Sequence, residues 1–407
     1  MTLPVRNPLI LPVYVPSLLL MFGNGMLIPI LPLYAWTFSA SYGLVGVVLA
    51  AEGVGRLIGA LPAGILLGRI GRKPAMVLGV GCVAVSTLAL FWARDLSEVV
   101  CYRLVAGIGG SLWHLSCHAY LTDAAPVFHR GRALSIFGGI HRIGTFAGPA
   151  AGGALAQTFS LEAPFLVFGG LATAVAFIAV AKFESEASPG VRQVRAGHWK
   201  PLLAIFKSHF RELATAGSGQ LFAQTIRAGR HVVVPLYAAD VIGLDVQAIG
   251  WIISISALVD MSLFYPAGHI MDRFGRKFAM VPCFLIQAIA MAAIPFTHSF
   301  AGLLLATTLL GMGNGIGSGS MMTLGADLAP RDSIGEFLGA WRLVGDTGHM
   351  GAPLVIGGIA DLLGLSPATF AIAGFGLLAA GTFAFLVPET LTSGASPESS
   401  QRGGEIE

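Results

Sequence analysis

The chain has 407 residues, of which 55% are hydrophobic and only 11% are charged, whereas a typical soluble domain is roughly 25% charged. Its mean hydropathy of +0.77 excludes an ordinary water-soluble fold and indicates a protein that crosses a membrane many times. The net charge of +3 follows from membrane topology and gives no indication of nucleic-acid binding.

Twelve hydrophobic stretches are long enough to cross a bilayer as helices, because a span needs about 20 mostly apolar residues. In chain order they lie near 9–34, 44–67, 75–93, 98–121, 132–157, 164–182, 211–238, 247–270, 278–297, 300–325, 337–360 and 366–388. We therefore predict an all-α membrane protein with 12 transmembrane helices, in two six-helix bundles over residues 1–183 and 209–390. A cytoplasmic linker is predicted over 184–208 and a disordered cytoplasmic tail over 391–407.

The positive charges are distributed unevenly between the two sides of the predicted membrane. Seventeen of the 24 Lys and Arg residues lie in the termini and loops after even-numbered spans, six lie inside spans, and Arg94 lies in a loop after an odd-numbered span. This asymmetry predicts that both termini are cytoplasmic. We expect a monomer that is integral to the lipid bilayer of a bacterial inner (plasma) membrane.

Several ionisable side chains fall inside the spans, where a charge costs about 2.5–3.5 kcal/mol on insertion scales unless a partner or water receives it. The candidates for proton coupling and gating are Glu52, Arg56, Arg103, Arg142, Asp260 and Asp346. His141, Arg342 and His349 also lie at membrane depth. The four cysteines fall within spans with no paired spacing, so neither a disulfide framework nor a metal site is expected.

The second half of the chain repeats the first at an offset of 204 residues. The most similar segments are two loops. The first contains Gly64, Gly68, Arg69, Gly71, Arg72 and Lys73, and the second contains Gly268, Asp272, Arg273, Gly275, Arg276 and Lys277. Such a repeat predicts two pseudo-symmetric copies of one module, an arrangement in which transporters place the substrate site at the seam between the copies.

These loops resemble the signature loop of the major facilitator superfamily, Gly-x-x-x-Asp-Arg-x-Gly-Arg-Lys/Arg, and the resemblance covers essentially the whole chain. Span five contains Gly144, Gly148, Pro149, Gly152 and Gly153, which is similar to the motif of the family's antiporters. Arg103 begins an Arg-x-x-x-Gly-x-Gly motif similar to that of proton-coupled drug exporters. The first loop departs from the pattern because Gly68 replaces the aspartate that helps to latch the two halves in the family.

The resemblance implies that spans one, four, seven and ten line the substrate cavity. Their polar candidates are Asn24, His114, His118, Arg227, Arg230, His231 and Asn314. It also implies that span two lies against span eleven and span five against span eight. Because the 204-residue offset maps Arg56 onto Asp260 and Arg142 onto Asp346, we expect cross-seam ion pairs of Arg56 with Asp346 and of Arg142 with Asp260. The alternative is that each charge has a permanent partner in its own bundle.

Taken with the resemblance, these residues predict a secondary active transporter and not an enzyme, driven by a proton gradient and needing no cofactor. We expect efflux of small amphipathic molecules or drugs in exchange for protons, with neutral or anionic substrates favoured by the basic cavity residues. His114 and His118 share a helix face, and proton carrying competes there with ordinary hydrogen bonding between helices. The alternatives are proton-coupled uptake of an organic anion or related metabolite and, less favoured, a non-transporting membrane receptor.

Overall fold

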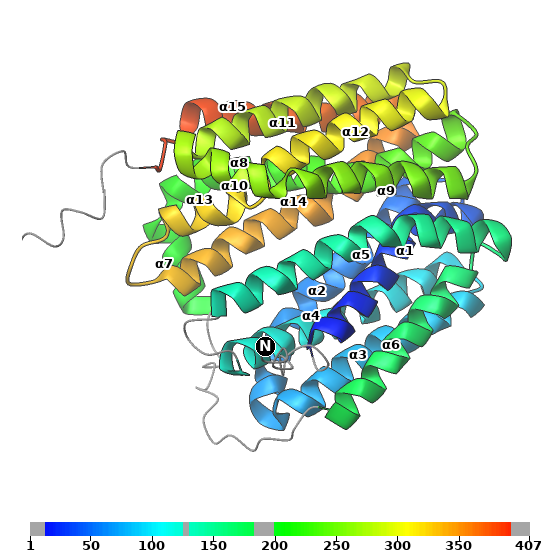
Figure 1. Ribbon diagram of the computed structural model, residues 1–407, viewed down its shortest axis with the longest axis horizontal. Helices are drawn as coiled ribbons and strands as arrows, with labels where there is room; N and C mark the ends of the chain where they lie inside the picture. The colour runs from blue at the N-terminus through cyan, green and yellow to red at the C-terminus, as the bar shows by residue number, and fades with distance from the viewer. Residues whose placement is uncertain (1–12, 125–129, 183–198, 392–407) are drawn as a thin grey trace, which may run out of the picture.

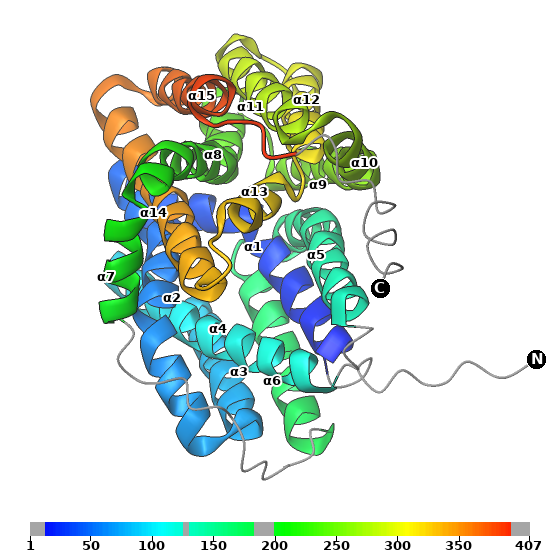
Figure 2. The same cartoon turned by 90° about the vertical axis from the view of Figure 1, so that its left-hand side faces the viewer.

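The computed structural model describes residues 13–124, 130–182 and 199–391, and these form two groups of long helices (Figure 1). The first group, here called the N-half, consists of α1 (Val15–Phe38), α2 (Tyr42–Ile70), α3 (Arg72–Ala89), α4 (Leu96–Ala124), α5 (Arg130–Thr158) and α6 (Ala163–Lys182). The C-half consists of α8 (Phe210–Leu236), α9 (Val246–Ser262), α10 (Phe264–Phe274), α11 (Arg276–Ala293), α12 (Phe300–Ile316), α13 (Ser320–Leu328), α14 (Ile334–Leu363) and α15 (Leu365–Gly381). Figure 2 shows the two groups facing each other across a seam.

The prediction of an all-α membrane protein with two six-span bundles is confirmed. Among the described residues, eight helical stretches are long and apolar enough to cross a membrane by themselves. The other four expected spans correspond to α4, α5, α8 and α14, which are 27–30 residues long. These four helices carry most of the candidates for coupling, gating and the substrate cavity, and these charged and polar side chains lower the hydropathy of the helices.

Spans eight and ten are found where the sequence predicts them, over Val246–Phe274 and Phe300–Leu328, but neither is one uninterrupted helix. Span eight is divided into α9 and α10 at Leu263, and span ten is divided into α12 and α13 at residues 317–319. Gly319 has φ = 80°, a conformation that ends a right-handed helix and that glycine adopts without steric cost. The corresponding helices of the N-half, α2 and α4, run unbroken for 29 residues each.

Part of the predicted linker is also helical. Its last ten residues form α7 (Trp199–Ser208), which lies against α14 and the start of α8. Residues 184–198 of the linker, the start of span one and nearly all of the predicted tail lie outside the described residues.

The two main interfaces of the seam are α2 with α14 and α5 with α9, which are related by the 204-residue offset, and α1 makes smaller contacts with α8 and α9. A Cβ atom on Gly46 would collide with the Pro353 carbonyl oxygen, and one on Gly250 would collide with the Pro149 carbonyl oxygen. Small residues allow this close backbone approach in lipid, where no hydrophobic force draws helices together. The antiporter-like motif of α5 therefore packs directly on the other half.

The four glycines of that motif face two different helices. Gly144, Gly148 and Gly152 face α1, where an added Cβ would meet atoms of residues 21–26. Gly153 instead faces α9 at Val246. The motif thus fixes α5 to α1 within the N-half and to α9 across the seam.

One end of the seam is joined by polar contacts between the halves. The Asp361 carboxylate at the end of α14 accepts hydrogen bonds from the Ser41 hydroxyl (2.7 Å) and from the backbone N–H groups of Tyr42 (2.7 Å) and Gly43 (3.0 Å). These N–H groups begin α2 and have no partner within that helix. The Tyr42 hydroxyl also donates to Asp240 of the C-half. We call this set of contacts the outer latch, because the predicted topology places it on the extracytoplasmic side.

Breaking the outer latch is expected to separate the extracytoplasmic ends of the two halves. Asp361→Asn removes the negative charge from the α2 N-terminus, where it interacts favourably with the helix dipole. Spin labels at residues 162 and 298, one in each half, should report a larger fraction of long distances by double electron–electron resonance. The matched control is Asp95→Asn, because the Asp95 carboxylate contacts Ser97 and Glu98 of its own half. An unchanged distance distribution in the Asp361 variant would contradict the latch.

Candidate functional site

A carboxylate with two arginine partners lies inside the N-half. Glu52 on α2 forms ion pairs with Arg103 on α4 and with Arg56, one turn further along α2. The Glu52 and Arg103 side chains are 15% and 7% exposed, whereas Arg56 is 45% exposed. Gly107 permits the contact, since a Cβ there would collide with the Glu52 carbonyl oxygen. The arginine of the span-four motif therefore meets a buried carboxylate, as a charge at membrane depth requires.

A second carboxylate site lies in the C-half. Asp260 Oδ2 on α9 accepts a hydrogen bond from Asn314 Nδ2 on α12 (2.6 Å) and lies 3.5 Å from Arg230 Nη2 on α8. Asp260 Oδ1 lies 3.4 Å from Nη1 of Arg142, which belongs to α5 of the N-half. The predicted cross-seam pair of Arg142 with Asp260 is therefore present, and two predicted cavity residues join it.

The other predicted cross-seam pair, Arg56 with Asp346, is not formed in this conformation. Arg56 pairs with Glu52, and Asp346 pairs with Arg342 at 3.7 Å on its own helix. The two copies differ because the offset maps Glu52 onto Ser256, so only the N-half has an acidic group one turn from this position. His349 on α14 does interact electrostatically with both Glu52 and Arg56 across the seam.

The break in span ten supplies partners for two arginines. Arg142 donates to the hydroxyl of Ser318, which lies in the three-residue break. Arg227 Nη2 donates to the Gly317 carbonyl oxygen at 3.3 Å, and its guanidinium lies over the Phe284 ring. Discontinuous helices in transporters commonly place backbone groups at a site in this way. The sequence carries a signal for this break, because Gly317 and Gly319 stand where the continuous helix of the N-half has Trp113 and Leu115.

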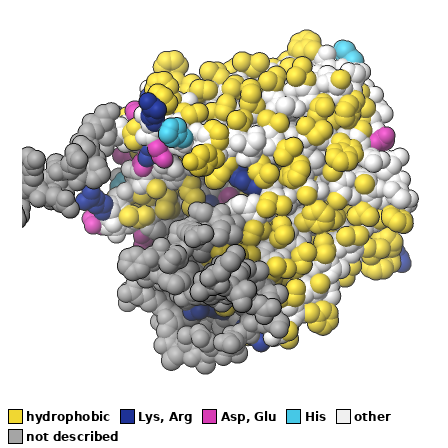
Figure 3. Space-filling model, in the orientation of Figure 1, with side chains coloured by type: hydrophobic (Ala, Val, Ile, Leu, Met, Phe, Trp, Pro, Cys, Tyr) yellow, Lys and Arg dark blue, Asp and Glu magenta, His cyan; other side chains and the backbone are white. Residues whose placement is uncertain are grey.

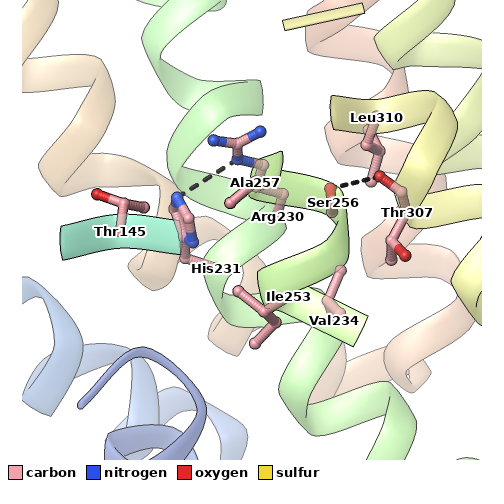
Figure 4. Close-up of a pocket in the computed structure, with 9 residues that line it drawn as sticks. All are labelled: Thr145, Arg230, His231, Val234, Ile253, Ser256, Ala257, Thr307 and Leu310. Atoms are coloured by element: carbon pink, nitrogen blue, oxygen red, sulfur yellow. Dashed lines mark hydrogen bonds between the residues drawn. The ribbon is translucent and has the colours of Figure 1, made fainter. Parts of the chain in front are cut away.

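Figure 4 shows a pocket at the seam, here called the seam pocket. Its lining includes Thr145 from α5, Arg230 and His231 from α8, Ser256 from α9 and Thr307 from α12. Arg230 Nε donates to His231 Nε2 at 3.3 Å, and the Ser256 hydroxyl donates to the Thr307 carbonyl at 2.5 Å. The buried Nδ1 of His231 has no partner among the described residues. The pocket thus offers basic and hydroxyl groups beside apolar side chains.

Three polar lining residues of the seam pocket were not among the sequence candidates, namely Thr145, Ser256 and Thr307. The offset relates them to His349, Glu52 and Arg103, so all three could have been found as counterparts of ionisable residues. Of the predicted cavity residues, Asn24 and His114 line a separate pocket inside the N-half. His118 packs its ring against Phe137 at 5.4 Å between ring centroids.

The signature loops differ in their contacts. A Cβ on Gly68 would have nothing within 4 Å, so the first loop has open space where the family has its aspartate. In the second loop, Asp272 lies 3.8 Å from Arg276, which also contacts Asp327 at 2.9 Å. These partners belong to the C-half, so the Asp272 contact does not cross the seam in this conformation.

The second loop is also bound by the segment that follows the last helix. Glu389 accepts hydrogen bonds from the backbone N–H groups of Arg276 (2.9 Å) and Lys277 (3.0 Å). Burial by itself would raise the pKa of this carboxyl, but the hydrogen bonds from Leu391, Lys277 and Arg276 outweigh it and lower the pKa. The carboxylate form that binds the start of α11 is therefore favoured at neutral pH.

Comparison with known proteins agrees with this architecture. A sequence model of the Major Facilitator Superfamily matches residues 14–226 and 216–405. The chain belongs to this superfamily. Members of the superfamily are transporters and not enzymes, so this chain is an integral membrane transporter.

The proteins that this transporter resembles differ in the functions that their names state. An uncharacterised MFS-type transporter of Methanocaldococcus jannaschii is 23% identical, over 87% of this chain and 92% of the relative. Multidrug resistance protein 2 of Bacillus subtilis is 24% identical, over 71% of this chain and 73% of the relative. The structure of a bacterial homologue of the human lysosomal transporter Spinster, inward-facing and unoccupied, superposes with a TM-score of 0.76 at 15% identity, covering 93% of this chain and 96% of that one. A D-xylose–proton symporter superposes with a TM-score of 0.69 at 17% identity, covering 93% and 98%.

Asp260 is expected to stabilise the folded protein because it is the shared counter-charge of Arg142 and Arg230. Asp260→Asn leaves Arg142 and Arg230 without their counter-charge and should destabilise the protein by on the order of 3 kcal/mol, as loss of a buried partner typically does. Asp272→Asn is the control, because Asp272 is 79% exposed and exposed pairs contribute about 0–1 kcal/mol. Thermal unfolding in detergent compares the two. Equal melting temperatures for both variants would show that Asp260 does not balance these arginines.

Proposed function

We propose that this transporter exports small amphipathic molecules in exchange for protons. The observation that carries the proposal is the buried Glu52 carboxylate held by Arg103 of the span-four motif. A carboxylate between two guanidinium groups can take up a proton when substrate or conformation draws those groups away. The multidrug resistance relative, and a class H tetracycline resistance protein of Pasteurella multocida that is 29% identical over 35% of this chain, support export.

Protonation of Glu52 would release Arg56 from its ion pair. Arg56 lies on α2, which packs against α14, and on α14 Asp346 forms only a 3.7 Å contact with the exposed Arg342. A released Arg56 can therefore pair with Asp346 and form the second cross-seam contact that the repeat predicts. We propose that this exchange of partners couples proton uptake to rearrangement of the seam.

The state described here is proposed to be open towards the cytoplasm. The outer latch joins the extracytoplasmic ends, whereas Arg342 and Asp346, nearer the other end of α14, are 78% and 54% exposed. Charged side chains in a span face the interior or a water-filled cavity. Figure 3 shows charged side chains at the seam on a face that is otherwise largely hydrophobic. With both termini cytoplasmic, as the Lys and Arg distribution predicts, such a cavity would admit substrate from inside a bacterial cell.

Neutral or anionic substrates fit the seam pocket best. Arg230 and His231 place basic groups beside Val234, Ile253 and Leu310, and no acidic residue lines this pocket within the described chain. A guanidinium group recognises carboxylate or phosphate oxygens through forked hydrogen bonds. The same basic lining favours, as a second candidate, proton-coupled uptake of an organic anion. The sign of substrate accumulation in oriented vesicles distinguishes the two directions.

The proton-coupling proposal predicts that transport against a substrate gradient stops when the proton gradient is collapsed. In inside-out vesicles, an uncoupler should abolish accumulation by the parent protein. Glu52→Gln should also abolish accumulation but retain exchange of substrate at equal concentrations, because the amide mimics the protonated acid. Glu98→Gln, at the exposed end of α4, is the control and should behave as the parent. Accumulation that survives loss of both the pH difference and the voltage would overturn the proposal.

Arg103 is expected to be needed for coupling because of its forked geometry as well as its charge. Arg103→Lys and Arg103→Ala should both insert in the membrane but lose about tenfold or more of coupled flux, since Lys keeps the charge and loses the planar fork. The measurement is uncoupler-sensitive flux normalised to the amount of inserted protein. A parental flux in Arg103→Ala would assign the coupling role to another residue, in spite of the contact with Glu52.

A further inference from the structure

The pocket inside the N-half differs from the seam pocket in position and in lining. It is enclosed by α1, α2, α3, α4 and α6, so it belongs to one bundle. Its polar lining residues are Asn24, Glu52, Arg56, Thr87, Arg103, Trp113 and His114. Its volume of about 40 Å³ can hold ordered water, which needs roughly 10–15 Å³, and is far below the roughly 300–1,000 Å³ of a drug-sized site.

Three polar atoms of this pocket are buried without a partner among the described residues. They are Arg103 Nε, Trp113 Nε1 and Thr87 Oγ1, on side chains that belong to residues only 6%, 2% and 1% exposed. Both nitrogens can only donate a hydrogen bond, so the missing partner must carry a lone pair. Buried polar groups without a protein partner are usually satisfied by an ordered water molecule.

The occupied guanidinium groups and the small size of the pocket favour water over a larger anion as that partner. Glu52 lines the same space, and its carboxylate would repel an anion placed beside it. Arg103 and Arg56 with Glu52 leave a net charge of +1, but both guanidinium groups already donate to the Glu52 carboxylate, and a volume of about 40 Å³ suits ordered water. Water can accept from Trp113 and Arg103 and can donate to the carboxylate at the same time.

We infer that the N-half pocket holds ordered water, positioned by Trp113 and Thr87, through which Glu52 exchanges its proton. The inference rests on the proposed function. In the exchange, a hydrated proton in the pocket gives its proton to a Glu52 carboxylate oxygen, an O–H bond forms there, and neutral water remains. The reverse step returns the proton to water. The groups that face Glu52 during the exchange are Arg56, Arg103 on α4 and His349 on α14, with His114 also lining the pocket.

Removing the two positioning groups is expected to slow proton exchange and leave substrate movement intact. Trp113→Phe keeps an aromatic ring without the N–H group, and Thr87→Val keeps the shape of the side chain without the hydroxyl. Each variant should lose about tenfold in proton-driven accumulation in vesicles. Exchange of labelled for unlabelled substrate at equal concentrations needs no net proton transfer and should stay within about twofold of the parent. Thr87→Ser restores a hydroxyl and should recover coupling.

Two buried residues of the C-half provide matched controls. Trp341→Phe removes an indole N–H that already donates to the Met321 carbonyl, and Thr369→Val removes a hydroxyl that donates to the Leu365 carbonyl. Both should leave the ratio of driven accumulation to exchange unchanged. If the variants at 87 and 113 keep the parental ratio of driven accumulation to exchange, the inference is wrong. An equal loss of accumulation and exchange gives that same ratio and has the same meaning. If substrate accumulation by the parent protein does not depend on the proton gradient, the proposed function is wrong instead.

Discussion

The constraint on which this structure depends is that charges inside the membrane must find partners within the protein. Water is absent from the hydrocarbon core, so an unpaired ionised group there is costly. The fold meets this requirement by bringing helix backbones very close together at glycines. Gly107 brings α4 against α2 beside Glu52, and Gly315 brings α12 against α9 at Asp260. The glycines that allow close packing of these helices therefore also allow the buried charges to reach their partners.

The two halves share one arrangement of helices but carry different side chains at equivalent buried positions. The offset places Ser256 and Thr307 where the N-half has Glu52 and Arg103, and a neutral hydrogen bond replaces the ion pair. The C-half carboxylate lies one turn further on, at Asp260, and is balanced by groups from both halves. A carboxylate with partners in its own half can take up a proton without itself breaking a contact of the seam, and its protonation then frees Arg56 to find a partner across the seam. One that holds the seam together is better suited to stabilising a conformation.

Much of this arrangement was predictable from sequence because it depends on periodicity and symmetry. The repeat offset, together with the helix neighbours that the resemblance to the superfamily implies, predicted the Arg142–Asp260 contact. The Arg56 partner was predicted wrongly, because Glu52 on the same helix face competes with Asp346 at shorter range. The outer latch was also not predicted, since Asp361 satisfies backbone N–H groups and no side-chain pattern marks such a contact.

The contacts along the seam divide into two kinds with different consequences for movement. Towards the predicted extracytoplasmic end, the seam is formed by backbone packed on backbone, as at Gly46 with Pro353, and by the outer latch. Such packing is lost as soon as the helices separate. In the middle of the seam, Arg142 reaches Asp260 and Ser318 with a long side chain. A long side chain can keep its partner while helices tilt. Under the proposed function, the seam would open at the packed end and pivot about Arg142, with the cross-seam ion pair as the hinge contact and the glycine–proline packing as the gate.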